Sequence, residues 1–293
     1  MTMAVRTLSI RKRRMSTRKV AQSAFSYSIL ILVTLLIMVP IIWLLITSLK
    51  AQTEYNVWPI QFLPKVPQWQ NYAEVFASRH HIFRYAGNSL FLAVTNTVLS
   101  IITSSLGGFA FSRFQDVPGR NRLFSVIIAL LIIPTLVTVI PQFIVFSRLG
   151  ITNTYWPWVL WGLGASAYYI FMFRQFFLAF PKELEDAAEV DGCNPLRIYW
   201  QIFLPNAKPV LATAFIQGFS GVWGDWFTPV IYLTSKNTTL AVKIATAYVT
   251  PQGNTIVTVT LAACVVYILP LIVMFFLGQQ HILKGVVTSG LKG

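Results

Sequence analysis

The residues best suited to chemistry lie in one acidic segment, between Pro181 and Pro205. This segment holds five of the chain's nine acidic residues within nine positions: Glu183, Glu185, Asp186, Glu189 and Asp191. Proline followed by acids is typical of a helix start, because acids favour the positive end of the helix dipole. Gly192 can adopt the left-handed conformation that ends a helix. The segment therefore predicts a short acidic helix that stops at a sharp bend.

A second short helix is expected after this bend. Asn194 is a typical N-cap and Pro195 a typical first helical residue. The apolar stripe of this helix is formed by Leu196, Tyr199, Trp200 and Phe203. We expect Pro205 to close the segment. An ordinary loop at the lipid headgroups would explain the amphipathic pattern, but it would not explain acids placed beside anionic lipid.

Common catalytic and metal-binding patterns are absent from the sequence. It contains no G-x-x-x-x-G-K-[ST] phosphate loop, no H-E-x-x-H and no G-x-S-x-G. His80 and His81 lack the further ligands that a metal site needs. Cys193 and Cys264 fit neither a disulfide framework nor a four-ligand zinc site. The chain is therefore expected to be no enzyme and to bind no cofactor or metal of its own.

The composition places the acidic segment in a membrane protein. Of 293 residues, 55% are apolar and 11% are charged, whereas soluble domains carry about 25% charged residues. A soluble enzyme and a disordered protein are thereby excluded. A net charge of +14 would suggest nucleic acid in a soluble chain. Here the positions of the charges favour a membrane instead, and no nucleic-acid partner is expected.

Charged residues divide the chain into long apolar windows. A spanning helix needs about 20 mostly apolar residues, and barrel strands would alternate in polarity, which these windows do not. Because backbone polar groups must be satisfied inside lipid, each window is expected to be helical. The sequence thus predicts an all-α integral membrane protein with six transmembrane helices, near 25–49, 86–111, 123–146, 155–174, 209–234 and 257–280.

The distribution of Lys and Arg predicts the orientation. With six spans, 16 of the 23 basic residues lie on the side of both termini and seven on the other, so the termini are expected to be cytoplasmic. The first apolar run is too long for a signal peptide and is expected to remain as an anchor, while the basic tail touches anionic lipid. The expected parts are a tail 1–24, a transmembrane domain 25–283 and a tail 284–293.

Residues 186–205 resemble the "EAA" signature of the inner-membrane permease subunits of bacterial ABC importers. The signature reads E-A-A, three residues, G, nine residues, I-x-L-P. It is matched without a gap by Asp186, Ala187, Ala188, Gly192, Ile202, Leu204 and Pro205. The one departure is Asp186 at the first position, preceded by Glu185. The resemblance implies a type I ABC importer permease fold, with 181–205 as its coupling loop.

Two further motifs extend this resemblance over roughly residues 30–293. Residues 66–72, followed by Asn88 and Ser89, are similar to sugar-importer permeases, and residues 282–293 are similar to the tail of the second permease of maltose-type transporters. The resemblance implies a heterodimer with a second permease in the bacterial inner membrane. It also implies two ATPase subunits, which would hold ATP and Mg, and an extracytoplasmic binding protein that delivers a sugar or oligosaccharide.

The resemblance also implies roles for individual residues. Contact with the ATPase would involve Glu185, Asp186, Ala187, Ala188, Glu189, Asp191, Gly192, Ile202, Leu204 and Pro205. The second short helix would pack on the bundle and carry the movement to the fifth span. The tail residues Gly290, Lys292 and Gly293 would insert between the ATPase subunits. The loop Pro251, Gln252, Gly253 and Asn254 would reach the binding protein, the alternative being a plain connecting turn.

Polar residues inside the expected spans could line the path of the sugar. The residues concerned are Asn88, Ser89, Asn96, Trp223, Asp225 and Trp226. Intramembrane acids usually face a bundle interior or a cavity, but hydrogen bonding between helices is an equal alternative for the polar set, and a structural role is an equal alternative for Asp225. Pro134 and Pro141 predict a static kink in the third span, with a hinge or gate as the alternative.

Other functions fit the sequence less well. The same architecture could import a polyol or glycerol phosphate, although the spans hold no Arg or Lys for a phosphate apart from Arg174 at the end of the fourth. A self-sufficient secondary transporter would usually show internal repeats and more spans. A membrane-anchored signalling or scaffold protein would not need the acidic segment.

We expect the purified chain alone to show no ATP hydrolysis, because its sequence has no phosphate-binding loop. The measurement is phosphate release by the isolated chain in detergent, with a complex containing ATPase subunits as the positive control. Turnover above background by the isolated chain would contradict the assignment.

Overall fold

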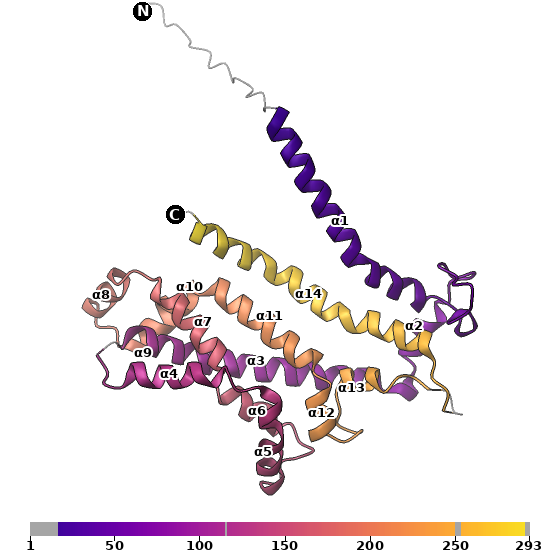
Figure 1. Cartoon of the computed structure of the whole chain (residues 1–293). Coiled ribbons are helices and arrows are strands. Elements are labelled where there is room, and N and C mark those ends of the chain that lie inside the picture. Colours follow the sequence, from indigo (N-terminus) through magenta and orange to yellow (C-terminus); the bar gives the residue numbers. More distant parts are fainter. Residues whose placement is uncertain (1–16, 115, 250–252, 291–293) are drawn as a thin grey trace, which may run out of the picture.

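The protein is built from helices arranged around one long central helix (Figure 1). The computed structural model describes residues 17–114, 116–249 and 253–290. Within these ranges, the only strand-like pairing is an isolated bridge between Val249 and Thr255. The prediction of an all-α protein is confirmed.

Three helices are long and apolar enough to cross a membrane unaided. They are α1 (Thr17–Ser48), α3 (Ile82–Arg113) and α14 (Val257–Gly290). Two of these helices extend beyond the expected spans. Helix α1 begins within the expected N-terminal tail, and α14 continues to Gly290, within the expected C-terminal tail. Helix propensity continues beyond the apolar windows on which the boundaries were based.

The third expected span, 123–146, is two helices rather than one. Helix α4 (Arg120–Leu130) and helix α5 (Thr135–Arg148) meet at an angle of 97°. Pro134 is the N-cap of α5, in extended backbone, since proline provides no N–H for the preceding turn. Pro141 lies inside α5 without ending it. The kink therefore forms at Pro134, and it separates two helices instead of bending one continuous helix.

The fourth and fifth expected spans are also interrupted. The fourth contains α6 (Trp156–Leu163) and α7 (Ala167–Leu178), and the fifth contains α11 (Lys208–Gly224) and α12 (Phe227–Tyr232). By length and composition, the described chain offers three spans. It offers up to five if two bent pairs each count as one span, namely α4 with α5 and residues 156–178 with 183–190. The count of six spans stays a prediction.

Short helices gather at the two ends of the molecule (Figure 1). At one end lie α8 (Glu183–Val190), α9 (Pro195–Ile198), the π-helical turn η3 (Tyr199–Phe203) and α10 (Leu204–Asn206). Towards the other lie η1 (Gln52–Glu54), α2 (Gln70–Val75), η2 (Ser78–His80) and α13 (Leu240–Ala245). The expected coupling loop is thus well separated from the 50–80 region.

Helix α3 is the centre of the packing. It contacts α6, α7 and α11, and α11 in turn contacts α14. The contact with α7 requires glycine at position 108, because a Cβ there would lie 2.6 Å from the Cβ of Phe173 and 2.8 Å from the backbone nitrogen of Arg174. Small residues allow such close approach between membrane helices.

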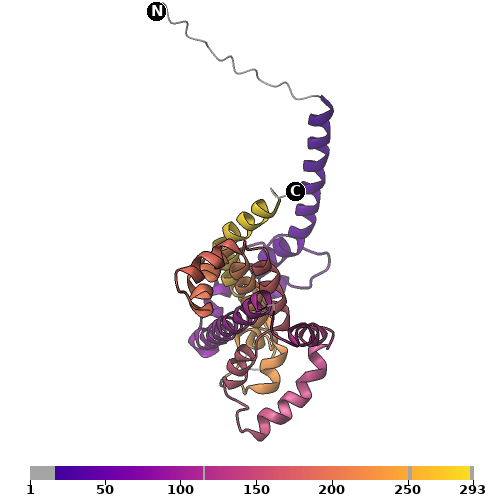
Figure 2. The same ribbon diagram turned by 90° about the vertical axis from the view of Figure 1, so that its left-hand side faces the viewer.

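Helix α1 joins this bundle chiefly through its contact with α14. In Figures 1 and 2 its N-terminal part points away from the other helices. None of the most apolar window of α1 is buried within the chain. Only its far end is covered, where Thr47 and Ser48 are buried. The apolar surface of α1 must therefore be covered by lipid or by another subunit.

We expect Gly108→Ala to lower the free energy of unfolding by about 1–3 kcal/mol, because the added methyl group overpacks the contact between α3 and α7. The matched control is Gly87→Ala on the same helix, where a Cβ would meet nothing within 4 Å. Thermal unfolding in detergent, followed by size-exclusion chromatography, compares the two variants. Equal melting temperatures would contradict the close-packing argument.

Candidate functional site

The acidic helix α8 ends in the bend that the sequence predicts. Gly192 has a φ of +77°. Its N–H donates to the Glu189 carbonyl, and the Cys193 N–H donates to the Ala188 carbonyl, both at 2.9 Å. This pair of hydrogen bonds is the Schellman motif, which closes a helix on a left-handed residue. The prediction that Gly192 needs a positive φ is confirmed.

The second helical segment starts as expected and ends differently. The Asn194 Oδ1 accepts a 2.8 Å hydrogen bond from the Arg197 N–H, and Pro195 opens α9. The helix then passes through η3 into α10, which contains Pro205. Pro205 therefore does not close the segment as predicted. A proline in the first turn of a helix lacks only an N–H that would have no partner there.

The second segment packs on the bundle through part of its apolar stripe. Tyr199 and Phe203 are fully buried, whereas Leu196 and Trp200 are about half exposed. The Tyr199 hydroxyl lies 2.7 Å from the Ser105 Oγ of α3, and the rings of Tyr199 and Phe203 lie against Phe109. The expectation that this helix packs against the chain's own bundle is confirmed, and Phe203 also lies against Phe177 of α7.

Arg113, at the end of α3, joins the two helical segments to the bundle. Its guanidinium donates to the carbonyls of Phe177, in the last turn of α7, and Phe180, just beyond the end of that helix. It lies 4.6 Å above the ring of Phe203. Its Nε forms an ion pair with the Glu185 carboxylate of α8 at 3.3 Å, and the Arg113 side chain is only 6% exposed. One side chain thus contacts α7, α8 and η3.

Glu185 therefore faces the chain's own bundle. Burial raises the pKa of its carboxyl, Arg113 lowers it, and Glu189 and Asp186 raise it further. Because the net shift is upward, desolvation of the charged form outweighs the attraction of Arg113. The ion pair then fixes the position of α8 more than it stabilises the fold.

The other acids of α8 point outward. Asp186, Glu189 and Asp191 are exposed, as is Ala187, while Ala188 is buried against the bundle. Of the two carboxylates at the start of the EAA-like motif, Asp186 is therefore the one free to meet a partner. Ile202 and Leu204 are half-buried and Pro205 is exposed.

A polar cavity of about 340 Å³ lies among α3, the break between α6 and α7, and α11. Its polar and aromatic lining includes Asn96, Ser100, Trp161, Ser166, Tyr168, Tyr169 and Gln217. The interruption between α6 and α7 places Ser166 at this cavity, where it also caps α7. Irregular backbone at membrane depth is tolerated where it lines a cavity. The cavity can therefore offer hydrogen bonds to a polar solute inside the bundle.

The six expected pathway residues are not brought together. Asn96 lines the cavity, with its amide donating to the Trp158 carbonyl at 2.7 Å. Asn88 donates to the Thr238 carbonyl, and the Ser89 Oγ accepts from the Leu240 N–H. The contacts of Asn88 and Ser89 agree with the alternative in which they hold neighbouring segments.

The three expected residues near the end of α11 also have structural contacts. Trp223 is buried and stacks between Phe219 and Tyr267. The Asp225 Oδ1 accepts a hydrogen bond from the Thr228 N–H at 3.0 Å, which caps α12. Trp226 is about half exposed. The contact of Asp225 agrees with the alternative in which it has a structural role.

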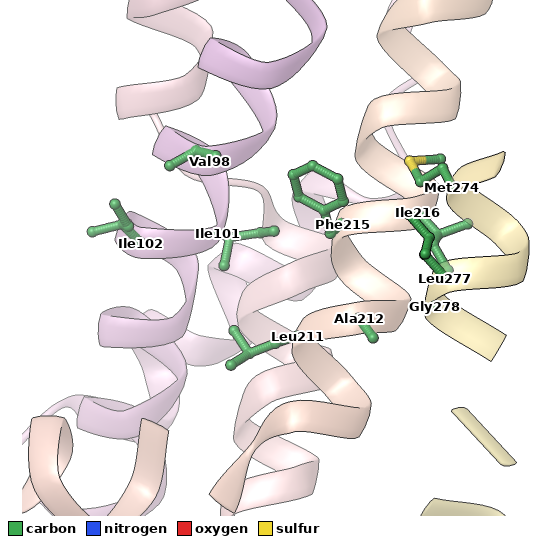
Figure 3. A pocket seen from close by; sticks show the side chains of 10 residues that line it. All are labelled: Val98, Ile101, Ile102, Leu211, Ala212, Phe215, Ile216, Met274, Leu277 and Gly278. Carbon is green, nitrogen blue, oxygen red and sulfur yellow. The ribbon is translucent and has the colours of Figure 1, made fainter. Parts of the chain in front are cut away.

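A second groove, of about 480 Å³, differs from the polar cavity in its chemistry. Figure 3 shows its ten side chains, all of them apolar, on α3, α11 and α14. The groove offers no side-chain hydrogen bonds to a polar solute. It therefore belongs to the surface that meets lipid or another membrane helix.

Some expected residues lie outside the described ranges. Pro251, Gln252, Lys292 and Gly293 are among them. Gly290 is the last residue of α14. Gly253 has a φ of +84°, and it lies with Asn254 just before Thr255, which bridges Val249. The contact of this loop with a binding protein stays a prediction.

Sequence analysis missed three contributors to these sites. Arg113 was counted only among the charges that set the orientation, although it is the last residue of its helix and faces the acidic segment. Tyr169 and Gln217 lie inside apolar windows, and Gln217 is the one side-chain amide of its window. A polar side chain surrounded by apolar residues is the signal that would have found Gln217.

The fold and the bent acidic loop define a helical membrane protein that holds a rigid helix outside its bundle. Residues 101–287 match the family described as the binding-protein-dependent transport system inner membrane component. The chain belongs to this family, and the resemblance to ABC importer permeases is confirmed.

Relatives and a solved structure agree with this assignment. The arabinooligosaccharides transport system permease protein AraQ of Halalkalibacterium halodurans is 33% identical, over 87% of this chain and 91% of that protein. The lactose transport system permease protein LacG of Rhizobium radiobacter is 32% identical, over 90% and 94%. A chain of a bacterial ABC transporter that imports alginate has the same fold, with a TM-score of 0.77 at 23% identity over 91% and 98%.

We expect Arg113→Ala to loosen the 183–206 segment by about 1–3 kcal/mol of opening free energy, because two carbonyls and a half-buried carboxylate lose their partner. Hydrogen exchange of the amides of α8 measures the opening. The control is Arg197→Ala, in the same loop, whose exposed guanidinium donates to Gln201 one turn further along. Unchanged exchange in Arg113→Ala would show that the segment is held by its apolar contacts alone.

Proposed function

We propose that this chain is one of two permease subunits of an importer that carries a sugar or oligosaccharide across the inner membrane. The second permease would complete the pathway, and two ATPase subunits would supply the energy. An extracytoplasmic binding protein would deliver the solute. Family membership and the relatives' names support the substrate class, since the named relatives transport arabinooligosaccharides and lactose.

The main support for the proposal is the set of contacts that holds α8 against the bundle. Exposed Asp186 and Glu189 offer charge to a basic partner, while Glu185 and Ala188 face inward. The Schellman bend at Gly192 fixes the direction of α8 relative to α9. A push on α8 would therefore pass through η3 and Arg113 to α3 and α7. Such a projection suits coupling to an ATPase and requires no catalytic residue on this chain.

The polar cavity supports a path through this subunit. It lies at the helices that Arg113 and η3 contact, so a movement of the coupling loop would change its walls. Tyr168, Tyr169 and Gln217 offer hydroxyl and amide groups that match sugar hydroxyls. The distribution of basic residues supports a cytoplasmic location for both termini and the coupling loop.

The test compares two glycines with the same backbone strain. Gly192 and Gly119 have φ of +77° and +82°, and a Cβ at either would meet nothing within 4 Å. Each valine substitution therefore costs roughly 1–2 kcal/mol of backbone strain without a clash. Uptake of a labelled saccharide, lactose or an arabinooligosaccharide, is measured in vesicles containing the complete transporter.

We expect Gly192→Val to insert normally and to lose most uptake, because α8 no longer points at its partner. Gly119→Val, in the loop between α3 and α4, should keep uptake near the wild-type level. Normal uptake and normal ATPase stimulation by Gly192→Val would exclude 181–205 as the coupling loop.

A further inference from the structure

A pocket separate from the polar cavity lies where the end of α1 meets residues 50–61. It has a volume of about 420 Å³, within the range of small-molecule sites. The pocket shares no lining residue with the polar cavity. Three aromatic side chains line it: Trp43, Tyr55 and Trp58. Aromatic walls of this kind provide flat apolar faces beside polar groups.

The same pocket holds buried acceptors that lack a hydrogen bond. The Glu54 Oε2, the Gln61 Oε1 and the Thr47 Oγ1 are all inaccessible to solvent, and no partner for them exists among the described residues. Thr47 as a whole is only 1% exposed. Because an unsatisfied buried polar group is costly, three in one pocket point to a missing donor.

Lys50 does not supply that donor. It is 3% exposed, and its ammonium donates to the Gln61 backbone carbonyl and lies 4.7 Å from the centre of the Trp43 ring. The Glu54 carboxylate is therefore left to bind something else. The pocket combines a buried cation and a carboxylate oxygen that do not pair with each other.

This combination selects the charge of the ligand. The Glu54 carboxylate disfavours a phosphate or another anion, and the Lys50 ammonium disfavours an amine. A neutral ligand with several hydroxyl groups satisfies the pocket, because a hydroxyl donates to Glu54 and Gln61 and both donates to and accepts from Thr47. The indole ring of Trp58, which is 85% exposed, offers an apolar face to the C–H surface of a sugar.

We propose that this pocket binds a saccharide, at a site distinct from the translocation path. The shared chemistry is a hydroxylated sugar ring, which a soluble saccharide and a glycolipid headgroup both offer. The inference goes beyond the proposed function, because it rests on the pocket's own unsatisfied groups and not on transport.

The experiment measures lactose binding by saturation-transfer difference NMR. The complete transporter is placed in phosphatidylcholine nanodiscs without binding protein. We expect Glu54→Ala and Trp58→Ala each to raise the Kd for lactose about tenfold, in line with the loss of a charge-assisted hydrogen bond or an aromatic face. Trp58 is 85% exposed, so its replacement leaves the fold intact.

The matched control is Trp69→Ala, a 68% exposed tryptophan in the same region that does not line the pocket. Its Kd should stay at the wild-type value. A second arm adds digalactosyl diacylglycerol to the nanodiscs. Loss of the Trp58-dependent lactose signal in this arm would assign the pocket to a glycolipid headgroup, and an unchanged signal assigns it to a soluble saccharide.

The inference is overturned if neither lactose nor the glycolipid gives a signal that depends on Glu54 and Trp58. Uptake measured on the same preparations keeps this result separate from the proposed function. If the transporter takes up saccharide but shows no Trp58-dependent binding, only the proposal for this pocket is rejected. If it shows Trp58-dependent binding but no saccharide uptake, only the proposed transport activity is rejected.

Discussion

Arg113 contacts three segments that are distant from it in the chain, and the position of the acidic helix depends on it. Its guanidinium caps the carbonyl end of α7, pairs with Glu185 on α8 and lies over the ring of Phe203 in η3. A planar group with several fixed donors suits such multiple contacts better than a lysine ammonium. Burial raises the pKa of the Glu185 carboxyl, because desolvation of its charge opposes the attraction of Arg113. The acidic helix is held at a defined angle, and this angle determines what it can meet.

Helix breaks supply the second constraint. A continuous helix buries its polar backbone in its own hydrogen bonds and offers nothing to a polar solute. The interruption between α6 and α7 brings Ser166 to the polar cavity, and the bend at Pro134 turns α4 away from α5. Close approach at Gly108 keeps α3 and α7 together beside these breaks. The bundle therefore combines tight packing along α3 with irregular backbone around the cavity.

Sequence patterns that act locally were predictive here. The acids, Gly192 and Asn194 define α8, its bend and the cap of α9 from neighbouring residues alone, and all three appear as expected. Contacts between distant residues were not predictable. Nothing near Glu185 in the chain shows that it faces Arg113, and nothing near Trp223 shows that it stacks on Tyr267. Hydropathy located the apolar windows but not the breaks, because a window average does not register a single extended residue such as Ser166.

Helix α1 is long and apolar enough to span a membrane, yet none of its most apolar window is buried within the chain. Most of its surface is left for whatever surrounds the folded subunit. In a subunit made in excess of its partners, this surface would contact lipid and no other subunit. That feature alone would distinguish it from an assembled copy. Helix α1 is thereby a natural point for cellular quality control, through which unassembled copies could be recognised and removed and subunit ratios kept in balance.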